Sequence, residues 1–449
     1  MDVLKISRVL HAGYLFESAE AKVLFDPLFE NPFSVNCYSF PAISFDYESI
    51  RSLSLDAIFI SHFHDDHFSM ESLKYLNRET PIYMFTVFPE LLELLKELGF
   101  AKVYALSLNA GVHIKDIKVT PRRALDEDVD SLFQIQSQGL NILNVVDSWI
   151  DDETLELLKN ESPWDLIMWP FQTMRELEVI APTRHLSKPA EIPLEWKEQL
   201  ESLKPRSLIP SSCQFKMEPW SWYNQYFFPI SYAFFQKEIS QILPTTNIFR
   251  LNPGESVFLD PSGVSPAERL SWVRAEEDPN ADCSFDLTRP IPSTSEIAKN
   301  FPVLETERQR VLKFCKEELS KAYEKLKDDA HDYFFQEGVW ELNIFEPGCE
   351  HRFLFRYIEG SIFACEDDLA PIFWKTEIPL KKLYGALESG ESLSSLYIRI
   401  NAQPFLEKYE KRLVNVEITE DPLLRVLYQK SLGSYQKAQL ERIKLSQGC

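Results

Sequence analysis

The sequence predicts an α/β fold over residues 1–262, followed by a smaller α+β domain over residues 305–449. Short apolar runs alternate with amphipathic helical patterns through the first 260 residues, which is typical of strands interleaved with helices. The run Ala57-Ile58-Phe59-Ile60 is continuously apolar, as expected for a strand covered on both faces. Residues 261–295 are rich in Pro, Ser, Asp and Glu and have no sustained period, so we predict a linker or wrapping segment over 263–304.

The individual elements are predicted from the spacing of apolar residues and from capping residues. In the first domain we expect strands at 3–10, 22–26, 57–60, 112–120, 131–137, 141–147, 164–169, 206–210 and 247–251. Helices are expected there at 69–76, 89–98, 151–159, 192–203 and 230–242. In the second domain we expect a helix at 305–327, strands at 340–345, 353–357 and 396–400, and a closing helix at 423–443.

Composition and charge narrow the class of function. The chain has 449 residues, of which 45% are hydrophobic and 26% charged, typical of a globular protein. Its formal net charge of −22 opposes attraction to nucleic acid or to an anionic membrane surface, so we expect a small-molecule substrate instead. No stretch approaches the ~20 apolar residues that a membrane span needs. The first residues lack an apolar core followed by a cleavage site, so we expect no secretion signal and a cytoplasmic protein.

Cysteine spacing indicates neither a disulfide framework nor a cysteine-based metal site. The seven cysteines are scattered and form no short pairs. They lie at positions 37, 213, 283, 315, 349, 365 and 449. We therefore interpret them as separate thiols in a reducing compartment.

The chemistry of the chain is concentrated in Ser61-His62-Phe63-His64-Asp65-Asp66-His67, which directly follows the predicted strand at 57–60. On the extended chain leaving that strand, His62 and His64 point to the same side, because side chains alternate with period two. Asp66 and His67 lie where the chain turns into the next predicted helix, so they can converge on the same point. Imidazole and carboxylate suit zinc, iron or manganese, and we predict one or two such divalent ions here.

This segment resembles the His-x-His-x-Asp-His signature of the metallo-β-lactamase superfamily. Residues 11–15 with Phe25-Asp26-Pro27 look like the opening hairpin of its lactonase and phospholipase-D-like branch, and Asn144-Val145-Val146-Asp147 resembles the strand end that supplies a bridging aspartate. The resemblance implies an αββα sandwich with the site at one edge of the two sheets. It also implies that His62 and His64 anchor one metal, that Asp66 and His67 anchor a second, and that Asp147 bridges them, with Asp66 also orienting the attacking water.

Two departures from the family pattern concern its remaining histidines. The region expected to hold a histidine upstream of the bridging aspartate contains none, and Asp126 is the nearest potential ligand. A carboxylate can replace an imidazole on iron, manganese or zinc, so we predict Asp126 as a ligand. The final family histidine, expected near residues 209–215, is also absent. Cys213 lies there, and we interpret it as a buried structural cysteine.

Several stretches also look like the catalytic part of CMP-N-acetylneuraminate hydroxylase, an unusual member of the superfamily. They are residues 56–73, 126–147 and 252–254. That family carries a Rieske module with paired Cys-x-His and Cys-x-x-His motifs, and this chain has no such pair. An enzyme of this kind would therefore need a separate electron donor. The second domain weakly resembles the small sterol-carrier-like domain found at the end of such proteins.

The sequence gives weaker evidence that other histidines take part in the metal site. His11 lies near the metal or supports a ligand, whereas His113 and His185 are more simply hydrogen-bonded residues. Residues 217–235 are rich in aromatic side chains, which we expect to pack in the core and partly to wall the substrate pocket, covered in part by the second domain.

The sequence predicts a metal-dependent hydrolase. Its substrate would be an ester, lactone, amide or phosphodiester, attacked by water that the metal activates. An alternative is a mono- or di-iron oxygenase related to the hydroxylase above, because a carboxylate-rich site suits iron. A third possibility is a non-catalytic module with a degenerate metal site.

Overall fold

The computed structural model describes residues 3–182, 190–326, 338–366, 372–401, 420–428 and 432–447. The chain divides into two compact units, which are described separately. The first unit comprises Met1–Met174, Ala190–Phe285 and Gln439–Cys449, and the second comprises Arg175–Pro189 and Asp286–Ala438. Among the helices in the described ranges, none has the length and apolar character required to cross a lipid bilayer.

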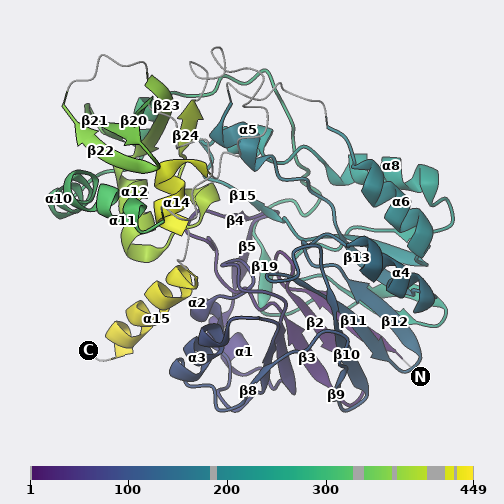
Figure 1. The fold of residues 1–449 in the computed structure, drawn as a ribbon. Coiled ribbons are helices and arrows are strands. Elements are labelled where there is room, and N and C mark those ends of the chain that lie inside the picture. The colour runs from purple at the N-terminus through teal and green to yellow at the C-terminus, as the bar shows by residue number, and fades with distance from the viewer. Residues whose placement is uncertain are drawn as a thin grey trace. The chain divides into compact units, whose positions relative to one another are not determined.

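The first unit contains an eight-stranded sheet with the order β18-β17-β1-β2-β3-β6-β7-β8 (Figure 1). Its strands are β1 (Leu4–Arg8), β2 (Tyr14–Glu17), β3 (Lys22–Phe25), β6 (Ala57–Ile60), β7 (Ile82–Met84), β8 (Val103–Ala105), β17 (Ser256–Asp260) and β18 (Gly263–Ala267). Strands β3, β6, β7 and β8 run parallel to one another, whereas the pairs from β18 to β3 are antiparallel.

A seven-stranded sheet with the order β16-β14-β13-β12-β11-β10-β9 lies against the first. Its strands are β9 (Val112–Ile114), β10 (Ile117–Arg123), β11 (Ser131–Ser137), β12 (Leu140–Asn144), β13 (Leu166–Pro170), β14 (Ser207–Ser211) and β16 (Asn247–Ile248). Apolar side chains of the two sheets form one buried cluster, in which Phe25 and Phe59 pack against Phe133 from the other sheet. The space between the sheets is therefore the main core of the unit.

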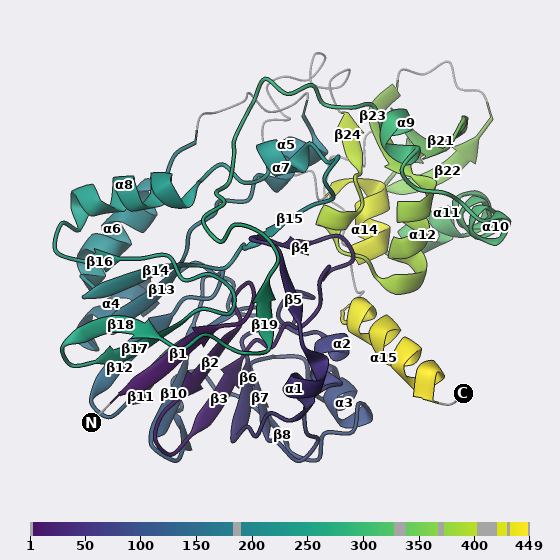
Figure 2. The same cartoon turned by 180° about the vertical axis from the view of Figure 1, so that it is seen from behind.

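Helices cover the outer faces of both sheets. A second apolar cluster joins the outer face of the seven-stranded sheet to α4 (Asp152–Asn160), α6 (Leu194–Leu203) and α8 (Tyr232–Ile242), through residues such as Leu158, Trp196 and Phe235. Figures 1 and 2 show α1 (Tyr47–Arg51), α2 (Met70–Leu73) and α3 (Pro89–Glu97) beside the eight-stranded sheet. The predicted αββα sandwich is confirmed.

Shorter elements complete the first unit. Two small antiparallel ribbons pair β4 (Tyr38–Ser39) with β15 (Phe215–Lys216) and β5 (Ile43–Phe45) with β19 (Val273–Ala275). Helix α7 (Tyr223–Tyr226) lies in the aromatic segment 217–235. Strands β18 and β19 fall inside the segment expected to be a linker, so residues 263–285 are part of the first unit. The sequence hid β18 because Pro266 interrupts it, and a proline is tolerated in this strand because it lies at the edge of its sheet.

The second unit is built on a five-stranded sheet with the order β22-β21-β20-β23-β24. The strands are β20 (Gly338–Glu346), β21 (Cys349–Ile358), β22 (Ser361–Cys365), β23 (Ile372–Pro379) and β24 (Arg399–Asn401). Its helical segments are α5 (Glu176–Ile180), α9 (Thr294–Ala298), α10 (Glu305–Lys313), a π-helical turn (Phe314–Glu318), α11 (Leu319–Glu324), α12 (Leu380–Ser389), a 3₁₀ turn (Leu393–Ser395) and α14 (Pro422–Tyr428). Helices and strands together make this an α+β unit, as expected.

The expected closing helix at 423–443 is divided in two. Helix α14 ends at Tyr428, and a separate helix, α15 (Ser434–Gln447), follows. Gly433 immediately precedes α15 with φ +68°, a left-handed conformation that breaks a helix and that glycine adopts without strain. The end of α15, from Gln439, belongs to the first unit, so the first unit contains chain from both ends of the sequence.

Candidate metal centre

The histidine-rich segment is a short loop between a buried strand and a capped helix. β6 ends at Ile60, and α2 begins at Met70, where the Ser69 hydroxyl accepts a hydrogen bond from the Ser72 amide. Inside the loop, the carbonyl of His64 accepts hydrogen bonds from the amides of His67 and Phe68. This turn folds the loop back and brings His67 beside His62, with their ring centroids 4.0 Å apart.

His62, His64 and Asp130 form a first cluster of potential ligands, with one ligand atom from each within 4.8 Å of the others. The His62 Nε2 atom lies 3.8 Å from Asp130 Oδ1. Asp130 immediately precedes β11, and the neighbouring Ser131 hydroxyl donates to the Ser61 carbonyl at 2.8 Å, which ties this end of β11 to the histidine loop. Because His64 is exposed, the first cluster opens to solvent.

A second cluster contains His11, Asp66, His67 and Asp147. His11 lies in the turn between β1 and β2, and Asp147 follows β12. Asp147 Oδ2 lies 3.0 Å from His67 Nε2 in this cluster, while Asp147 Oδ1 lies 3.8 Å from His62 Nε2 in the first cluster. Asp147 therefore presents one carboxylate oxygen to each cluster.

Asp26, at the end of β3, orients two of the histidines. Its Oδ1 accepts from the Ser61 amide at 2.7 Å, and its Oδ2 accepts from the Ser61 hydroxyl at 2.7 Å and lies 3.1 Å from His67 Nδ1. An ionised carboxylate only accepts, so His67 donates from Nδ1. Since the Ser61 proton goes to Asp26, the Ser61 oxygen accepts from His62 Nδ1 at 2.9 Å. In its neutral form, each imidazole thus carries its proton on Nδ1 and directs an unprotonated Nε2 at the clusters.

Burial and mutual charge shift the pKa values of these groups in opposite directions. Burial raises the pKa of Asp147, but the charges of His67 and His62 and the hydrogen bonds from His11 and His67 together outweigh this effect and hold the pKa well below its ordinary value. Burial and the charges of His67 and His64 lower the pKa of His62. Burial and the charge of Asp147 raise the pKa of Asp130 to about 6. Above that pH, Asp130 is ionised and His62 is neutral, as metal ligation requires. Burial lowers the pKa of His67, but the charges of Asp147 and Asp66 outweigh it and raise this pKa well above its ordinary value, so a bound metal would have to displace a proton from the His67 ring.

Four residues in or beside the two clusters have a left-handed backbone conformation. Residues with positive φ include His11, Asp26, Val146 and Cys213, each in or beside the two clusters. Val146, at φ 64°, is β-branched, and such a residue is rarely found in this conformation. Strained residues persist where the surrounding structure holds them, and they are common at functional sites.

Aromatic side chains form a wall on one side of His11. The rings of Phe33 and Phe215 lie 5.9 and 5.8 Å from the His11 ring, centroid to centroid, and Phe228 packs on Phe215 at 5.0 Å. Phe228 belongs to the aromatic segment 217–235, of which most large side chains are buried. This apolar wall limits the access of water to the second cluster.

The comparisons with known proteins concern the first unit. Residues 5–210 match the family model described as "Beta-lactamase superfamily domain", which spans both clusters. The first unit has the metallo-β-lactamase fold. A protein of Mycolicibacterium smegmatis named "Putative Rieske 2Fe-2S iron-sulfur protein" is 32% identical over 101 residues, which are 22% of this chain and 19% of that protein. The chain thus aligns with about a fifth of the length of the curated relatives that it matches.

Solved structures similar to this metallo-β-lactamase domain share little sequence with it. A metallo hydrolase from Ignicoccus hospitalis is 14% identical, with a TM-score of 0.41, over 57% of this chain and 99% of that one. An isothiocyanate hydrolase from gut bacteria of Delia radicum is 14% identical, with a TM-score of 0.43, over 56% of this chain and 98% of that one. CmlA, a diiron β-hydroxylase from Streptomyces venezuelae, is 15% identical, with a TM-score of 0.40, over 57% of this chain and 54% of that one.

The structure does not place Asp126, a predicted ligand, beside the other candidate ligands. Asp126 is exposed and lies in neither cluster, and Asp130 stands beside His62 and His64 instead. The backbone explains the difference, because the Asp126 carbonyl accepts hydrogen bonds from the amides of Val129 and Asp130. This turn leaves Asp126 on the outside and directs Asp130 inward. Of the other predicted residues, His62, His64, Asp66, His67 and Asp147 all lie in the two clusters of the metallo-β-lactamase domain.

The sequence reasoning missed Asp130 and the role of Asp26, and it left His11 open. His113 is exposed on β9 and lies in neither cluster, and His185 lies outside the described residues. Cys213 is buried, and burial together with the charge of Asp147 raises the pKa of its thiol, which opposes the thiolate form that a metal requires. The signal for Asp130 was its position directly before a strand that pairs with β12, so that it shares a sheet edge with Asp147.

The donor set fits divalent metal ions. Asp130 Oδ1 is buried and has no hydrogen-bond partner among the described residues, as expected of an oxygen that faces a ligand position. The set combines imidazole nitrogens with carboxylate oxygens, which suits zinc, iron or manganese.

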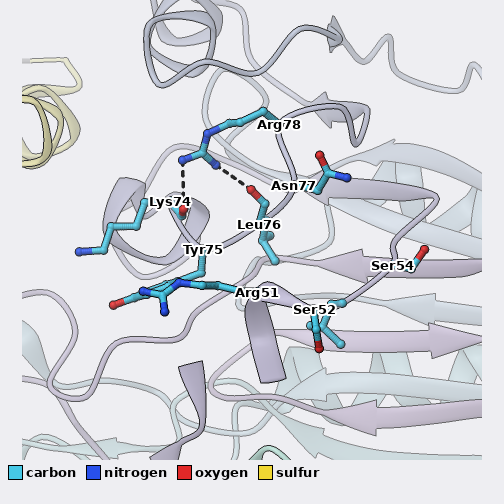
Figure 3. A pocket seen from close by; sticks show the side chains of 9 residues that line it. Arg51, Ser52, Ser54, Lys74, Tyr75, Leu76, Asn77 and Arg78 are labelled. Carbon is cyan, nitrogen blue, oxygen red and sulfur yellow. Dashed lines mark hydrogen bonds between the residues drawn. The ribbon is translucent and has the colours of Figure 1, made fainter. Parts of the chain in front are cut away.

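A hollow of about 590 Å³ beside α1 and α2 is separate from this site (Figure 3). No residue of either cluster lines it. Its cationic side chains have other partners: Arg51 pairs with Glu48, Lys74 pairs with Glu71, and Arg78 donates to backbone carbonyls. We assign it no ligand.

Proposed function

We propose that the metallo-β-lactamase domain is a two-metal hydrolase of an ester, lactone, amide or phosphodiester. The observation that carries this proposal is the carboxylate of Asp147, whose two oxygens face different clusters. A group in this position is suited to bridge two ions. In the proposed arrangement, His62, His64 and Asp130 hold one ion and Asp66 and His67 hold the other. Bound there, the ions supply Lewis-acid polarisation of the scissile group and lower the pKa of water.

The residues of the chain prepare the site before any substrate arrives. Asp26 and Ser61 fix the ring orientations of His67 and His62, so both rings direct Nε2 at the clusters without rearrangement. The second proposed ion has three protein ligands, Asp66, His67 and Asp147, which leaves a position free for water or substrate, as in catalytic rather than structural sites. Phe33 and Phe215 exclude water on one side, while the exposed His64 marks the open side where a substrate enters.

An iron-dependent oxygenase is the second candidate, because of the donors in the first cluster. Two histidines with one carboxylate form the ligand type used by non-heme iron oxygenases. With this function the protein would take electrons from a separate partner. The naming of the mycobacterial relatives for a Rieske cluster supports a partner of that kind.

Two measurements on one preparation distinguish these functions. Elemental analysis of protein purified without added metal identifies the ions, and turnover is then measured with ester, lactone, amide and phosphodiester substrates. Zinc with turnover of one class supports the hydrolase. Iron with oxygen consumption that depends on an added reductant supports the oxygenase.

The double variant His62→Ala/His64→Ala tests the first cluster, and His113→Ala is its control because it alters an exposed histidine. The double variant should lose metal and turnover while remaining folded, and His113→Ala should retain both. A metal-free wild type, or a double variant with full metal content, would contradict both functions.

A further inference from the structure

His11 differs from the other buried histidines of the site in the way its ring is held. It lies between β1 and β2, fully buried, with φ 53°. The Arg8 guanidinium donates to the His11 carbonyl, and it also donates to the Pro210 carbonyl at 2.9 Å. It also donates to the Ser212 carbonyl at 3.4 Å, so this arginine ties the backbone of His11 to β14 and to the segment that follows it.

The backbone amide of Cys213, in that segment, determines the proton position on the His11 ring. This amide donates to His11 Nδ1 at 2.9 Å. A nitrogen that accepts a hydrogen bond carries no proton, so the proton of the neutral ring is on Nε2. Cys213 holds this position with φ 48°, a conformation that costs free energy in a non-glycine residue.

The surroundings of His11 Nε2 are acceptors. It lies 3.1 Å from Asp66 Oδ2 and 3.6 Å from Asp147 Oδ2. It also lies 3.1 Å from His67 Nε2, which carries no proton when the His67 ring is neutral, because His67 donates from its other nitrogen to Asp26. One N–H group thus faces the carboxylate oxygens of both Asp66 and Asp147.

The tautomer of His11 is the reverse of that found in His62 and His67. Those two rings donate from Nδ1 and present a lone pair at Nε2, the form in which a neutral imidazole binds a metal. His11 presents an N–H group at Nε2. Ligation through that atom would require removal of the second imidazole proton or loss of the bond from Cys213.

We propose that His11 is a positioning residue and not a metal ligand. Its Nε2–H group holds the carboxylates of Asp66 and Asp147 in the orientation that ligation needs. This inference rests on the proposed function, because it assumes that those two carboxylates bind metal. It leaves the second ion with Asp66, His67 and Asp147 as its protein ligands and an open position for substrate.

The variants His11→Gln and His67→Gln test the assignment. Glutamine carries a donor near the place of Nε2 and conserves the neutral charge. Metal per chain is measured by elemental analysis after reconstitution with Zn²⁺ and dialysis. We expect wild-type stoichiometry in His11→Gln and a loss of one ion per chain in His67→Gln. Equal loss of metal in both variants would overturn the proposal.

A second measurement uses the unaltered protein, in case His11→Gln does not fold. In zinc-loaded protein labelled with ¹⁵N-histidine, nitrogen–proton couplings report which ring nitrogens carry a proton. We expect a proton on Nε2 of His11 and none on Nε2 of His62 or His67. An unprotonated Nε2 on His11 would refute the inference even if the enzyme is active. A wild type that binds no zinc would instead refute the proposed function.

Discussion

The substitution Asp26→Asn tests how the histidine orientations are fixed. Asp26 is fully buried, and its two oxygens accept from the Ser61 amide, the Ser61 hydroxyl and His67 Nδ1. Asparagine has one acceptor oxygen and one amino group, so in either orientation at least one of these buried donors loses its partner. An unsatisfied buried group costs about 1–3 kcal/mol of unfolding free energy. His67 also loses the carboxylate that fixes its tautomer.

We therefore expect Asp26→Asn to weaken metal binding about 10–100-fold, as for other substitutions behind a metal ligand. That range corresponds to roughly 1.4–2.8 kcal/mol of binding free energy. Competition with a chromophoric chelator measures the affinity, and urea denaturation measures the unfolding free energy. The matched control is Asp126→Asn, which alters an exposed aspartate outside both clusters. Wild-type affinity in Asp26→Asn would refute the argument that this carboxylate orients the ligands.

Three further predictions concern Asp130 in the first cluster, the buried Glu30, and Gln439 on the C-terminal helix. Asp130→Ala should lose about one metal ion per chain, as measured by elemental analysis, whereas Asp126→Ala should lose none. The reverse result would show that Asp126, and not Asp130, is the ligand. Burial raises the pKa of Glu30 from 4.5 to about 7. The folded state therefore binds the proton of the Glu30 carboxyl more tightly than the unfolded state does. The stabilisation by protonated Glu30 is present below about pH 4.5 and is lost as the pH rises through about 7. Glu30→Gln should therefore become more stable than wild type by up to about 3 kcal/mol between about pH 5 and pH 8 in urea denaturation, and a stability difference independent of pH would contradict this reasoning. Gln439 on α15 accepts a hydrogen bond from the Met70 amide at the start of α2 and donates one to Glu30. Gln439→Leu should therefore accelerate hydrogen exchange in α2 and cost about 0.5–1.5 kcal/mol of stability. Exchange in α2 no faster than in the exposed control variant Glu441→Ala would show that α15 does not hold α2.

The sequence predicted the sandwich because its strands have continuous apolar runs and its helices have a clear period. Residues such as Phe59 and Trp196 lie in the predicted elements and form the two cores. Elements that depend on tertiary pairing were missed. Strand β18 contains Pro266 and is stabilised by its pairing with β17, and the break at Gly433 separates two segments with the same helical pattern.

The site was predictable where its residues are close in sequence. His62, His64, Asp66 and His67 share one loop, and their types and spacing indicate a metal. Asp130 was not predicted, because two aspartates four residues apart are equivalent in sequence until a turn directs one of them inward. The proton on His11 depends on the Cys213 amide, 202 residues away. No local pattern in the sequence contains that information.

The central claim is that Asp147 joins two metal positions, and anomalous diffraction from crystals of metal-loaded protein tests it most directly. Data collected at the absorption edge of the bound metal place each ion independently of the protein model. The account predicts two anomalous peaks per chain, one beside His62, His64 and Asp130 and one beside Asp66 and His67. Each peak should lie about 2.0–2.2 Å from one oxygen of Asp147, if the ions are zinc. A single peak, or two peaks of which only one contacts Asp147, would contradict the account.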